Sequence, residues 1–514
     1  MAVVFSLDDI SKKVQEDLVK ELTLIAVDPY VEKQKSWGKT VNYTPPSEPV
    51  SMYIASAKTR EIRLPFHVAM KRMGTKPNRD KIFPKLCKKG APKFMTELRD
   101  YQIPVAEECL QNLKDNCTTT LGLPPAWGKT IVGAYLAGKA NGVMMVLTHR
   151  KKIAQAWVKT FTLCYPQLAK MIYFVGEYEA TEGVVASKIC LNPIQGEKGV
   201  ESCGECKGCT EEDYIVPGII ICMDKRFEKI DKRILDSVAV TIVDEAHLFC
   251  TPARVGCLLS TEPKFIIAET ATPNRKNGMW CMMESIVGPV GVFRMPDKPH
   301  RVYKVFTGIS VSTKQGARGL DFTDMTHNLI NNEERNKLAI NCVKCNKHRK
   351  IIIMVRFKNH VPLLQKMLEE EDIKVDTLFG SKENYSDSHV LIGTIPKMGV
   401  GFDEANSCDD YQGRPSDLLI LMTSIADQDC YEQVKGRVMR SDDPVVFYLE
   451  DNMAIVKRHI KNIEPWIEQT KGEVIEVSYE EDEMAIPNLK YINGVGIEVP
   501  IRKKKKKIVI KKEE

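Results

Sequence analysis

Short apolar runs separated by helix-length segments restrict the possible folds of this 514-residue chain. A run that is apolar at every position, rather than at every second one, predicts a strand with both faces buried. The intervening segments predict the helices that cover those faces. One series of runs lies at 143–147, 219–222, 238–243 and 265–268, and a second at 351–355, 390–392, 418–422 and 445–449. The predicted fold class is therefore α/β, with two successive domains that each contain a parallel sheet.

The two series divide the chain into four predicted parts. A helical segment and a proline-bearing stretch before the first series indicate an accessory N-terminal domain, whose function the sequence leaves open. The predicted parts are the accessory domain at 1–90, the first α/β domain at 91–305, the second at 306–460, and a C-terminal extension with a basic tail at 461–514.

The net charge of +6 lies entirely in the tail, because residues 502–514 carry eight basic and two acidic side chains. Global basicity therefore gives no argument for nucleic-acid binding, which must rest on motifs. No apolar run approaches the roughly 18 residues that a membrane span needs, so no membrane partner is expected. Most of the 16 cysteines are solitary in apolar stretches, which predicts a reducing, intracellular compartment.

A nucleotide site is predicted at Gly128-Lys129-Thr130, immediately before an apolar, helix-like segment at 131–137. Backbone N–H groups at a helix start, a lysine ammonium and a hydroxyl together suit phosphates and their Mg²⁺. The strict phosphate-loop spacing requires a glycine where this chain has Leu123. A chance Gly-Lys-Thr turn before a helix remains the alternative for this motif alone.

Two adjacent carboxylates, Asp244 and Glu245, follow the apolar run at 238–243. At the end of a buried strand, Asp244 can hold Mg²⁺ and Glu245 can orient or deprotonate an attacking water. The alternative is an acidic turn that caps the next helix.

With both motifs in place, the chain resembles the superfamily 2 helicases with a DEAH box, since residues 244–247 read Asp-Glu-Ala-His. Further motifs follow in the order of that family: Thr-Ala-Thr-Pro at 270–273, Gly-Phe-Asp at 401–403 and Gln-x-x-Gly-Arg-x-x-Arg at 433–440. The layout most resembles the DNA helicases of large cytoplasmic DNA viruses, namely poxvirus-type transcript-release helicases and their asfarvirus relatives.

The resemblance implies two RecA-like domains in an ATP-dependent DNA helicase or translocase that uses ATP and Mg²⁺. It also implies a role in viral transcription or recombination, in the host cytoplasm or virion. The implied catalytic residues are Lys129, Asp244, Glu245, Gln433, Arg437 and Arg440. The implied nucleotide contacts are Gln102, Gly128, Lys129, Thr130 and Asp403, with Thr130 and Asp244 as Mg²⁺ ligands. The implied contacts to the nucleic-acid strand are Arg150, Thr270, Thr272 and Thr394.

The phosphate loop departs from the pattern of the family, which reads Pro-Thr-Gly-x-Gly-Lys-Thr. Here Ala126 replaces a glycine that allows close approach of the backbone to phosphate. Two alternatives to the DNA helicase therefore stay open. One is an RNA helicase, and the other is a nucleic-acid-binding scaffold with an impaired ATPase.

Four cysteines form a separate cluster in the sequence, at Cys190, Cys203, Cys206 and Cys209. Close spacing with intervening glycines lets a tight loop present four thiolates to one tetrahedral Zn²⁺, in a knuckle at about 188–212 inserted in the first domain. An iron–sulfur cluster and unligated cysteines are the alternatives. A weaker metal-like pattern is formed by Cys342, Cys345 and His348.

Overall fold

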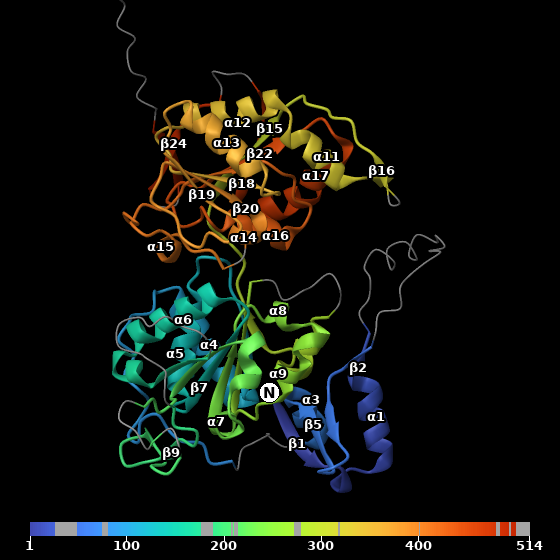
Figure 1. Ribbon diagram of the computed structural model, residues 1–514, viewed down its shortest axis with the longest axis vertical. Coiled ribbons are helices and arrows are strands. Elements are labelled where there is room, and N and C mark those ends of the chain that lie inside the picture. Colours follow the sequence, from blue (N-terminus) through green and yellow to red (C-terminus); the bar gives the residue numbers. More distant parts are fainter. Residues whose placement is uncertain are drawn as a thin grey trace, which may run out of the picture. The chain divides into compact units, whose positions relative to one another are not determined.

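The computed structural model of the protein consists of two compact units, Met1–Arg294 and Met295–Glu514 (Figure 1). The residues that it describes are 1–25, 49–74, 81–175, 189–206, 209, 214–271, 279–316, 319–399, 401–479, 484–492 and 495–499. Thr272 and the basic tail at 502–514 therefore lie outside the described residues. Among the helices within these ranges, none is long and apolar enough to span a bilayer.

The first unit is built on a parallel sheet of seven strands within the described ranges, in the order β14-β6-β13-β12-β7-β11-β8. Its strands are β6 (Thr118–Gly122), β7 (Val143–Thr148), β8 (Ile172–Val175), β11 (Ile219–Met223), β12 (Val238–Val243), β13 (Phe265–Thr270) and β14 (Gly291–Phe293). The strand order differs from the chain order, so residues from distant motifs become neighbours along one edge.

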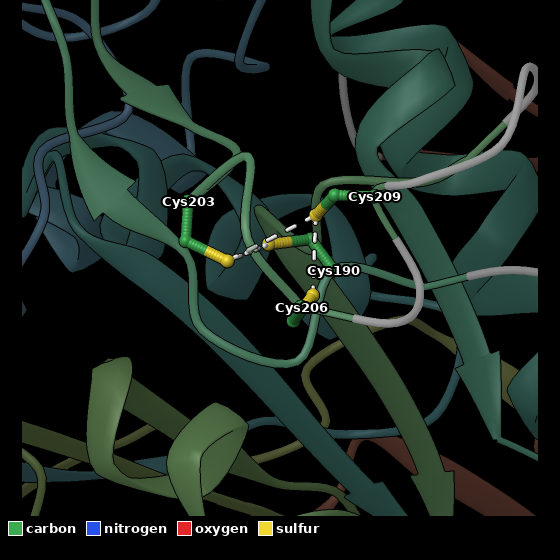
Figure 2. Close-up of side chains that lie close together, drawn as sticks. All are labelled: Cys190, Cys203, Cys206 and Cys209. Carbon is green, nitrogen blue, oxygen red and sulfur yellow. Dashed lines mark hydrogen bonds between the residues drawn. The ribbon is translucent and has the colours of Figure 1, made fainter.

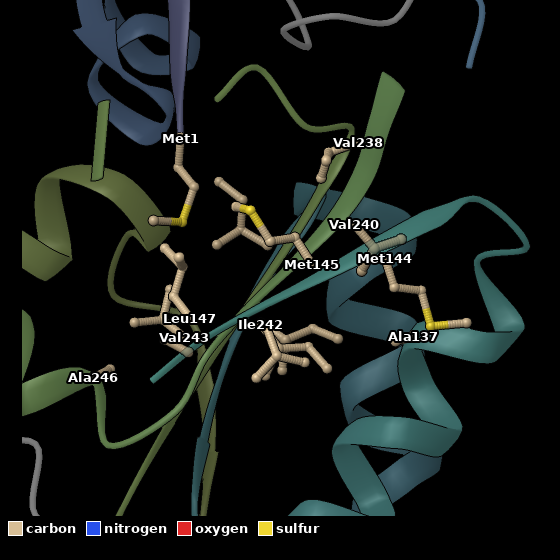
Figure 3. Close-up of a cluster of buried hydrophobic side chains, with 14 of the residues drawn as sticks. Met1, Ala137, Met144, Met145, Leu147, Val238, Val240, Ile242, Val243 and Ala246 are labelled. Carbon is tan, nitrogen blue, oxygen red and sulfur yellow. The ribbon is translucent and has the colours of Figure 1, made fainter. Parts of the chain in front are cut away.

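Both faces of this sheet are buried, which explains why its strands are apolar at every position. Figure 3 shows Met144 and Val240 pointing toward Ala137 of a covering helix, while Leu147 and Val243 point to the other side, toward Met1. Figure 1 shows α4, α5 and α6 beside the sheet on one side and α8 and α9 on the other. The helices are α4 (Gln102–Asn116), α5 (Lys129–Lys139), α6 (Lys151–Cys164), α7 (Lys232–Ser237), α8 (Ala246–Phe249), α9 (Val255–Leu259) and α10 (Cys281–Val287).

The N-terminal segment is part of the first unit and packs against its parallel sheet. Its core residues Met1, Leu64 and Phe66 belong to the same buried cluster as the parallel sheet, and the backbone N–H of Ala2 donates to the carbonyl of Thr261 at 2.8 Å. A small antiparallel sheet in the order β1-β5-β4 carries these contacts. The helices and strands of the N-terminal segment are β1 (Ala2–Ser6), α1 (Lys12–Leu22), β2 (Thr23–Leu24), β3 (Val50–Ser51), β4 (Ile54–Ser56), β5 (Glu61–Pro65) and α3 (Phe66–Met73).

The second unit also contains a parallel sheet of seven described strands, in the order β19-β20-β18-β21-β22-β15-β23. Its strands are β15 (His300–Phe306), β18 (Ile351–Val355), β19 (Val375–Leu378), β20 (Val390–Thr394), β21 (Leu418–Leu421), β22 (Val445–Glu450) and β23 (Gly472–Ser478). Two short hairpins flank it, β16 (Gln315–Gly316) with β17 (Gly319–Leu320), and β24 (Asn488–Ile492) with β25 (Val495–Val499).

Alternate residues of β18 explain how this second sheet is covered. Ile351 and Ile353 pack in one buried cluster with Leu338 and Leu364, whereas Ile352 packs in another with helix residues of α16 and α17. The helices are α11 (Phe322–Ile330), α12 (Glu333–Cys345), α13 (His360–Glu369), α14 (Ile395–Met398), α15 (Glu404–Ser407), α16 (Gln428–Lys435) and α17 (Ala454–Gln469). Two parallel sheets with helices on both faces confirm the predicted α/β class and its two RecA-like domains.

The unit boundaries differ from those predicted. The division falls between Arg294 and Met295 rather than after residue 305, so β15 belongs to the second sheet. The predicted C-terminal extension begins inside α17, and β23 beyond it pairs with β15 along its whole length. Parallel pairing joins segments far apart in the chain, so boundaries drawn along the sequence separated strands that share a core.

Candidate nucleotide and nucleic-acid site

The phosphate loop joins the end of β6 to the start of α5 at Lys129. Gly128 has a φ of +79° and Ala126 a φ of +67°, so Ala126 adopts the left-handed conformation that the missing glycine would favour. That conformation costs a residue with a Cβ about 1–2 kcal/mol. A Cβ on Gly128 would lie 2.6 Å from Nε2 of Gln102. The loop therefore keeps a closed, glycine-like backbone despite the alanine.

Two polar side chains hold this loop. Nζ of Lys129 donates to the carbonyl of Leu123 at 3.1 Å. Nε2 of Gln102, which is buried at the start of α4, donates to the carbonyl of Trp127 at 2.8 Å. Oε1 of Gln102 accepts from the N–H of Arg99 at 2.9 Å. Thr130 follows Lys129 in the first turn of α5, so the predicted loop residues and Gln102 lie together.

Asp244 lies directly after β12 and is only 7% exposed. Its Oδ2 accepts a hydrogen bond of 2.8 Å from the indole Nε1 of Trp157. Burial, followed by the charge of Glu245, raises the pKa of Asp244 to about 6, while Trp157 and Lys129 favour its ionised form. The Asp244 carboxylate is therefore held in a dry site by one neutral donor and one nearby ammonium.

Glu245 has a φ of +48° and precedes α8. Its Oε2 lies 3.4 Å from Nδ1 of His247 and, within the described part of the chain, accepts no hydrogen bond. Nδ1 of His247 also lies 2.9 Å from Oγ1 of Thr270 at the end of β13. His247 thus connects the paired carboxylates to the first threonine of the predicted coupling motif.

Trp157 and a second buried acid, Glu269, were not among the predicted site residues. Glu269 is fully buried on β13, and neither of its oxygens has a hydrogen-bond partner among the residues that the structure describes. A Cβ added to Gly133 of α5 would lie 1.8 Å from its Oε1. Burial, followed by the charge of Asp244, raises the pKa of Glu269 well above its ordinary value. In the sequence, the signal for this buried acid is a glutamate that directly follows the apolar run at 265–268.

Arg150 follows β7, the sheet neighbour of β12, and is the residue before α6. It is half-buried, and burial lowers its pKa. The adjacent His149 is also half-buried, and burial, followed by the charge of Arg150, lowers the pKa of His149 to about 4. The structure therefore places Arg150 and Thr270 at the carboxyl ends of two strands of the same parallel sheet. Thr272 lies outside the described residues.

In the second unit, three predicted residues lie together. Arg440 forms an ion pair with Asp403, and Nη2 of Arg437 donates to the carbonyl of Gly399 at 2.7 Å. Arg437 also donates to the carbonyl of Phe402. Thr394 is buried at the end of β20 and precedes α14, which ends next to this loop.

The two arginines of the Gln-x-x-Gly-Arg-x-x-Arg motif lie beyond the helix that contains its glutamine. Helix α16 contains Gln433 but ends at Lys435, and Gly436 is its C-cap. Beyond it the N–H of Arg437 donates to the carbonyl of Val434 at 3.2 Å, a turn of three residues rather than a helical bond. Glycine costs a helix interior about 1 kcal/mol, which favours termination here.

The four clustered cysteines do come together, as Figure 2 shows, with their ligand atoms all within 4.8 Å of one another. The weaker pattern is not a metal group, because in the described part of the chain only the first cluster brings at least three such ligands together. Cys342 instead lies fully buried, with its Sγ 3.6 Å from Sδ of Met484.

Known proteins similar to this chain include viral and yeast proteins. Residues 95–275 match the family described as "Type III restriction enzyme, res subunit". The chain is 26% identical over 420 residues to "Putative helicase 161L" of Invertebrate iridescent virus 6, covering 77% of this chain and 85% of the relative. It is 23% identical over 381 residues to "Transcript termination protein A18" of Fowlpox virus, covering 68% and 73%. The solved structure of S. cerevisiae Dbp5 bound to RNA and ADP BeF3 aligns over 74% of this chain and 92% of that one, with a TM-score of 0.47 and 11% identity.

The helicase-type relatives, together with Gly128-Lys129-Thr130 and Asp244-Glu245 on one parallel sheet, indicate a nucleotide-hydrolysing enzyme that binds nucleic acid. The chain resembles the superfamily 2 helicases, and the relatives that it matches include viral putative helicases and the fowlpox transcript termination protein.

Proposed function

We propose that the chain is an ATP-dependent DNA helicase or translocase that couples ATP hydrolysis to movement along nucleic acid. One observation carries the proposal: Lys129 and Thr130 begin a helix at the same sheet edge where Asp244 and Glu245 follow a strand. The carboxyl ends of parallel strands meet at one edge, and Lys129 is near enough to lower the pKa of Asp244.

The residues of the first unit fit ATP and Mg²⁺. Lys129 would bind the phosphates, and Thr130 and Asp244 would hold Mg²⁺, which neutralises charge on the transferred phosphoryl group. Glu245 would orient the attacking water and accept its proton, since its Oε2 is buried without a hydrogen bond from any described residue. The left-handed backbone at Ala126 supports a working phosphate loop and weakens the case for a disabled scaffold.

The remaining residues take the roles that the family implies. Gln102 would pair with the adenine edge, which requires its amide to leave the carbonyl of Trp127. Asp403 would contact the ribose. Arg437 and Arg440 would neutralise charge developing on the γ-phosphate, and Gln433 belongs to the same motif.

The strand contacts are proposed for Arg150, Thr270, Thr272 and Thr394. Contacts to phosphates position a strand without reading its bases, so low sequence preference is expected. The resemblance to the DNA helicases of large cytoplasmic DNA viruses supports DNA as the substrate. The viral relatives support the host cytoplasm or virion as the location. The printed name of the fowlpox relative supports a role in viral transcription.

ATPase activity of the full chain, measured in parallel with single-stranded DNA, duplex DNA and RNA, tests this function. We expect DNA to stimulate turnover. We expect Lys129→Ala to lower kcat/KM by at least about 100-fold, since an interaction with the transferred phosphoryl group is lost. Lys139→Ala, at the far end of the same helix, is the matched control.

Each alternative gives a different result. Stimulation by RNA alone would make the protein an RNA helicase. DNA binding by a wild-type chain without measurable hydrolysis would identify a scaffold. Undiminished turnover by Lys129→Ala would remove the catalytic assignment of the phosphate loop.

A further inference from the structure

The four-cysteine cluster defined by Cys190, Cys203, Cys206 and Cys209 has no part in the proposed hydrolysis. It lies in an insertion of the first unit that leaves the sheet after β8 and rejoins it at β11. Figure 2 shows the four sulfur atoms converging on one point from separate turns of the chain. All four cysteines are free of disulfides.

Two of the sulfur–sulfur distances match those around a single tetrahedral ion, and a third is shorter. A Zn–S bond of about 2.3 Å requires neighbouring sulfurs about 3.8 Å apart. The Sγ atoms of Cys190 and Cys203 are 3.8 Å apart, those of Cys203 and Cys209 are 3.9 Å apart, and those of Cys206 and Cys209 are 3.1 Å apart. A disulfide would bring a pair to about 2.05 Å, so these contacts are not bonds.

An iron–sulfur cluster fits less well than a single ion. Its several iron atoms and bridging sulfides stand between the thiolates and hold opposite pairs apart, whereas here all four sulfurs lie within 4.8 Å of one another. A backbone donor is also in place, because the N–H of Leu191 donates to Sγ of Cys206 at 3.3 Å. Such a donor orients a ligand and offsets the negative charge of four thiolates around one divalent ion.

The described residues of the insertion form little regular secondary structure. Its described secondary structure is the two-residue pair β9 (Ile194–Gln195) and β10 (Val200–Glu201) with a bridge between Ile189 and Ile215. Short segments of this kind rarely fold without a metal or disulfides, because they bury too little apolar surface.

The insertion nevertheless docks closely on the segment before the first sheet. The N–H of Lys88 donates to the carbonyl of Lys198 at 3.0 Å. A Cβ on Gly199 would lie 2.1 Å from the carbonyl of Leu86, and a Cδ of Leu86 lies 3.0 Å from the Cβ position of Gly218. Gly218 precedes β11, so this contact is at the amino ends of the strands, away from the phosphate loop.

We propose that Cys190, Cys203, Cys206 and Cys209 bind one structural Zn²⁺, which fixes the insertion to the amino end of the first sheet. The ion stabilises the first unit and takes no part in the chemistry of the nucleotide. Metal loss is therefore expected to lower thermal stability before it lowers the turnover of the folded enzyme.

Metal analysis of the full-length chain tests the proposal. We expect about one zinc per chain in the wild type, and on the order of tenfold less in Cys203→Ser and Cys206→Ser, because each removes one of four ligands. Cys281→Ser, at a half-buried cysteine outside the cluster, is the control and should retain the zinc. The two cluster variants should also melt at a lower temperature than the control.

If the cysteine variants fail to fold, Co²⁺ binding by the wild-type protein still tests the proposal. Wild-type protein stripped of metal and titrated with Co²⁺ should show the intense visible absorption of a tetrahedral thiolate site, saturating at one ion per chain, and Zn²⁺ should displace it. Stoichiometric iron, no uptake of either ion, or full zinc in Cys203→Ser would overturn the proposal. Because ATPase activity is not the readout, failure here is distinguishable from failure of the proposed helicase function.

Discussion

The indole of Trp157 donates to Oδ2 of Asp244 at 2.8 Å, and Trp157→Phe removes that donor while keeping an aromatic ring. The hydrogen bond stabilises the ionised carboxylate, in a site where burial already raises the pKa of Asp244 to about 6. Its loss must therefore raise the pKa further. Since only the ionised form binds Mg²⁺ well, the variant should need a higher pH to work.

The size of the shift follows from the strength of the bond. A hydrogen bond to a charged group contributes about 1.5–3 kcal/mol, and one pKa unit corresponds to about 1.36 kcal/mol. The pKa of Asp244 should then rise by about one to two units, to about 7–8. At pH 7 the ionised fraction would fall from about nine-tenths to between about one half and one tenth. We expect kcat/KM for ATP to fall about two- to tenfold at pH 7 and to recover toward pH 9.

The assay is the pH profile of kcat/KM at a fixed Mg²⁺ concentration below saturation and at saturating nucleic acid, which reports groups of the free enzyme. Trp466→Phe is a matched control, because Nε1 of Trp466 donates to Oε2 of Glu432 at 3.1 Å in the second unit. The control should keep the wild-type acidic limb. If the acidic limb of Trp157→Phe stayed in place, or activity fell equally at every pH, the bond would not set the ionisation of Asp244.

Two further predictions concern buried charges. Glu269→Leu should raise the free energy of unfolding at pH 7 by about 1–3 kcal/mol, because it removes a buried carboxyl without a described partner. The raised pKa of Glu269 means that wild-type stability falls as pH rises above the ordinary carboxyl value. The stability that Glu269→Leu gains, measured by urea unfolding, should therefore grow with pH. If Glu269→Leu were less stable than the wild type at pH 7, Glu269 would be stabilised by an ion pair. Arg335→Ala should lower the free energy of unfolding by about 3–5 kcal/mol, because it leaves the buried Asp451 without its counter-ion. Nε of Arg335 lies 2.8 Å from Oδ1 of Asp451, and both side chains are at most 2% exposed. Lys337→Ala removes an exposed ion pair on the same helix and should lower the free energy of unfolding by less than about 1 kcal/mol. Equal losses in the two variants would contradict the role of burial.

Periodicity alone was enough to predict the two sheets. The run at 351–355 is apolar throughout because Ile351 and Ile352 face separate buried clusters, one on each side of the sheet. The hypotheses about the candidate site came from local motifs, as with Lys129, Asp244 and the four cysteines. These signals are readable because each lies in a short segment whose chemistry does not depend on distant neighbours.

The environment of those residues was decided by tertiary structure. Trp157 and Asp244 are 87 positions apart, and Glu269 lies against Gly133 because β13 is inserted between β6 and β12. Side chains that meet across a parallel sheet are set by strand order, which periodicity does not encode. The same reason explains why Met1 joins the core of the first sheet and why β15 and β23 pair in the second. The sequence by itself therefore determined the class of fold and the reactive groups, while strand order determined how those groups are buried, paired and charged.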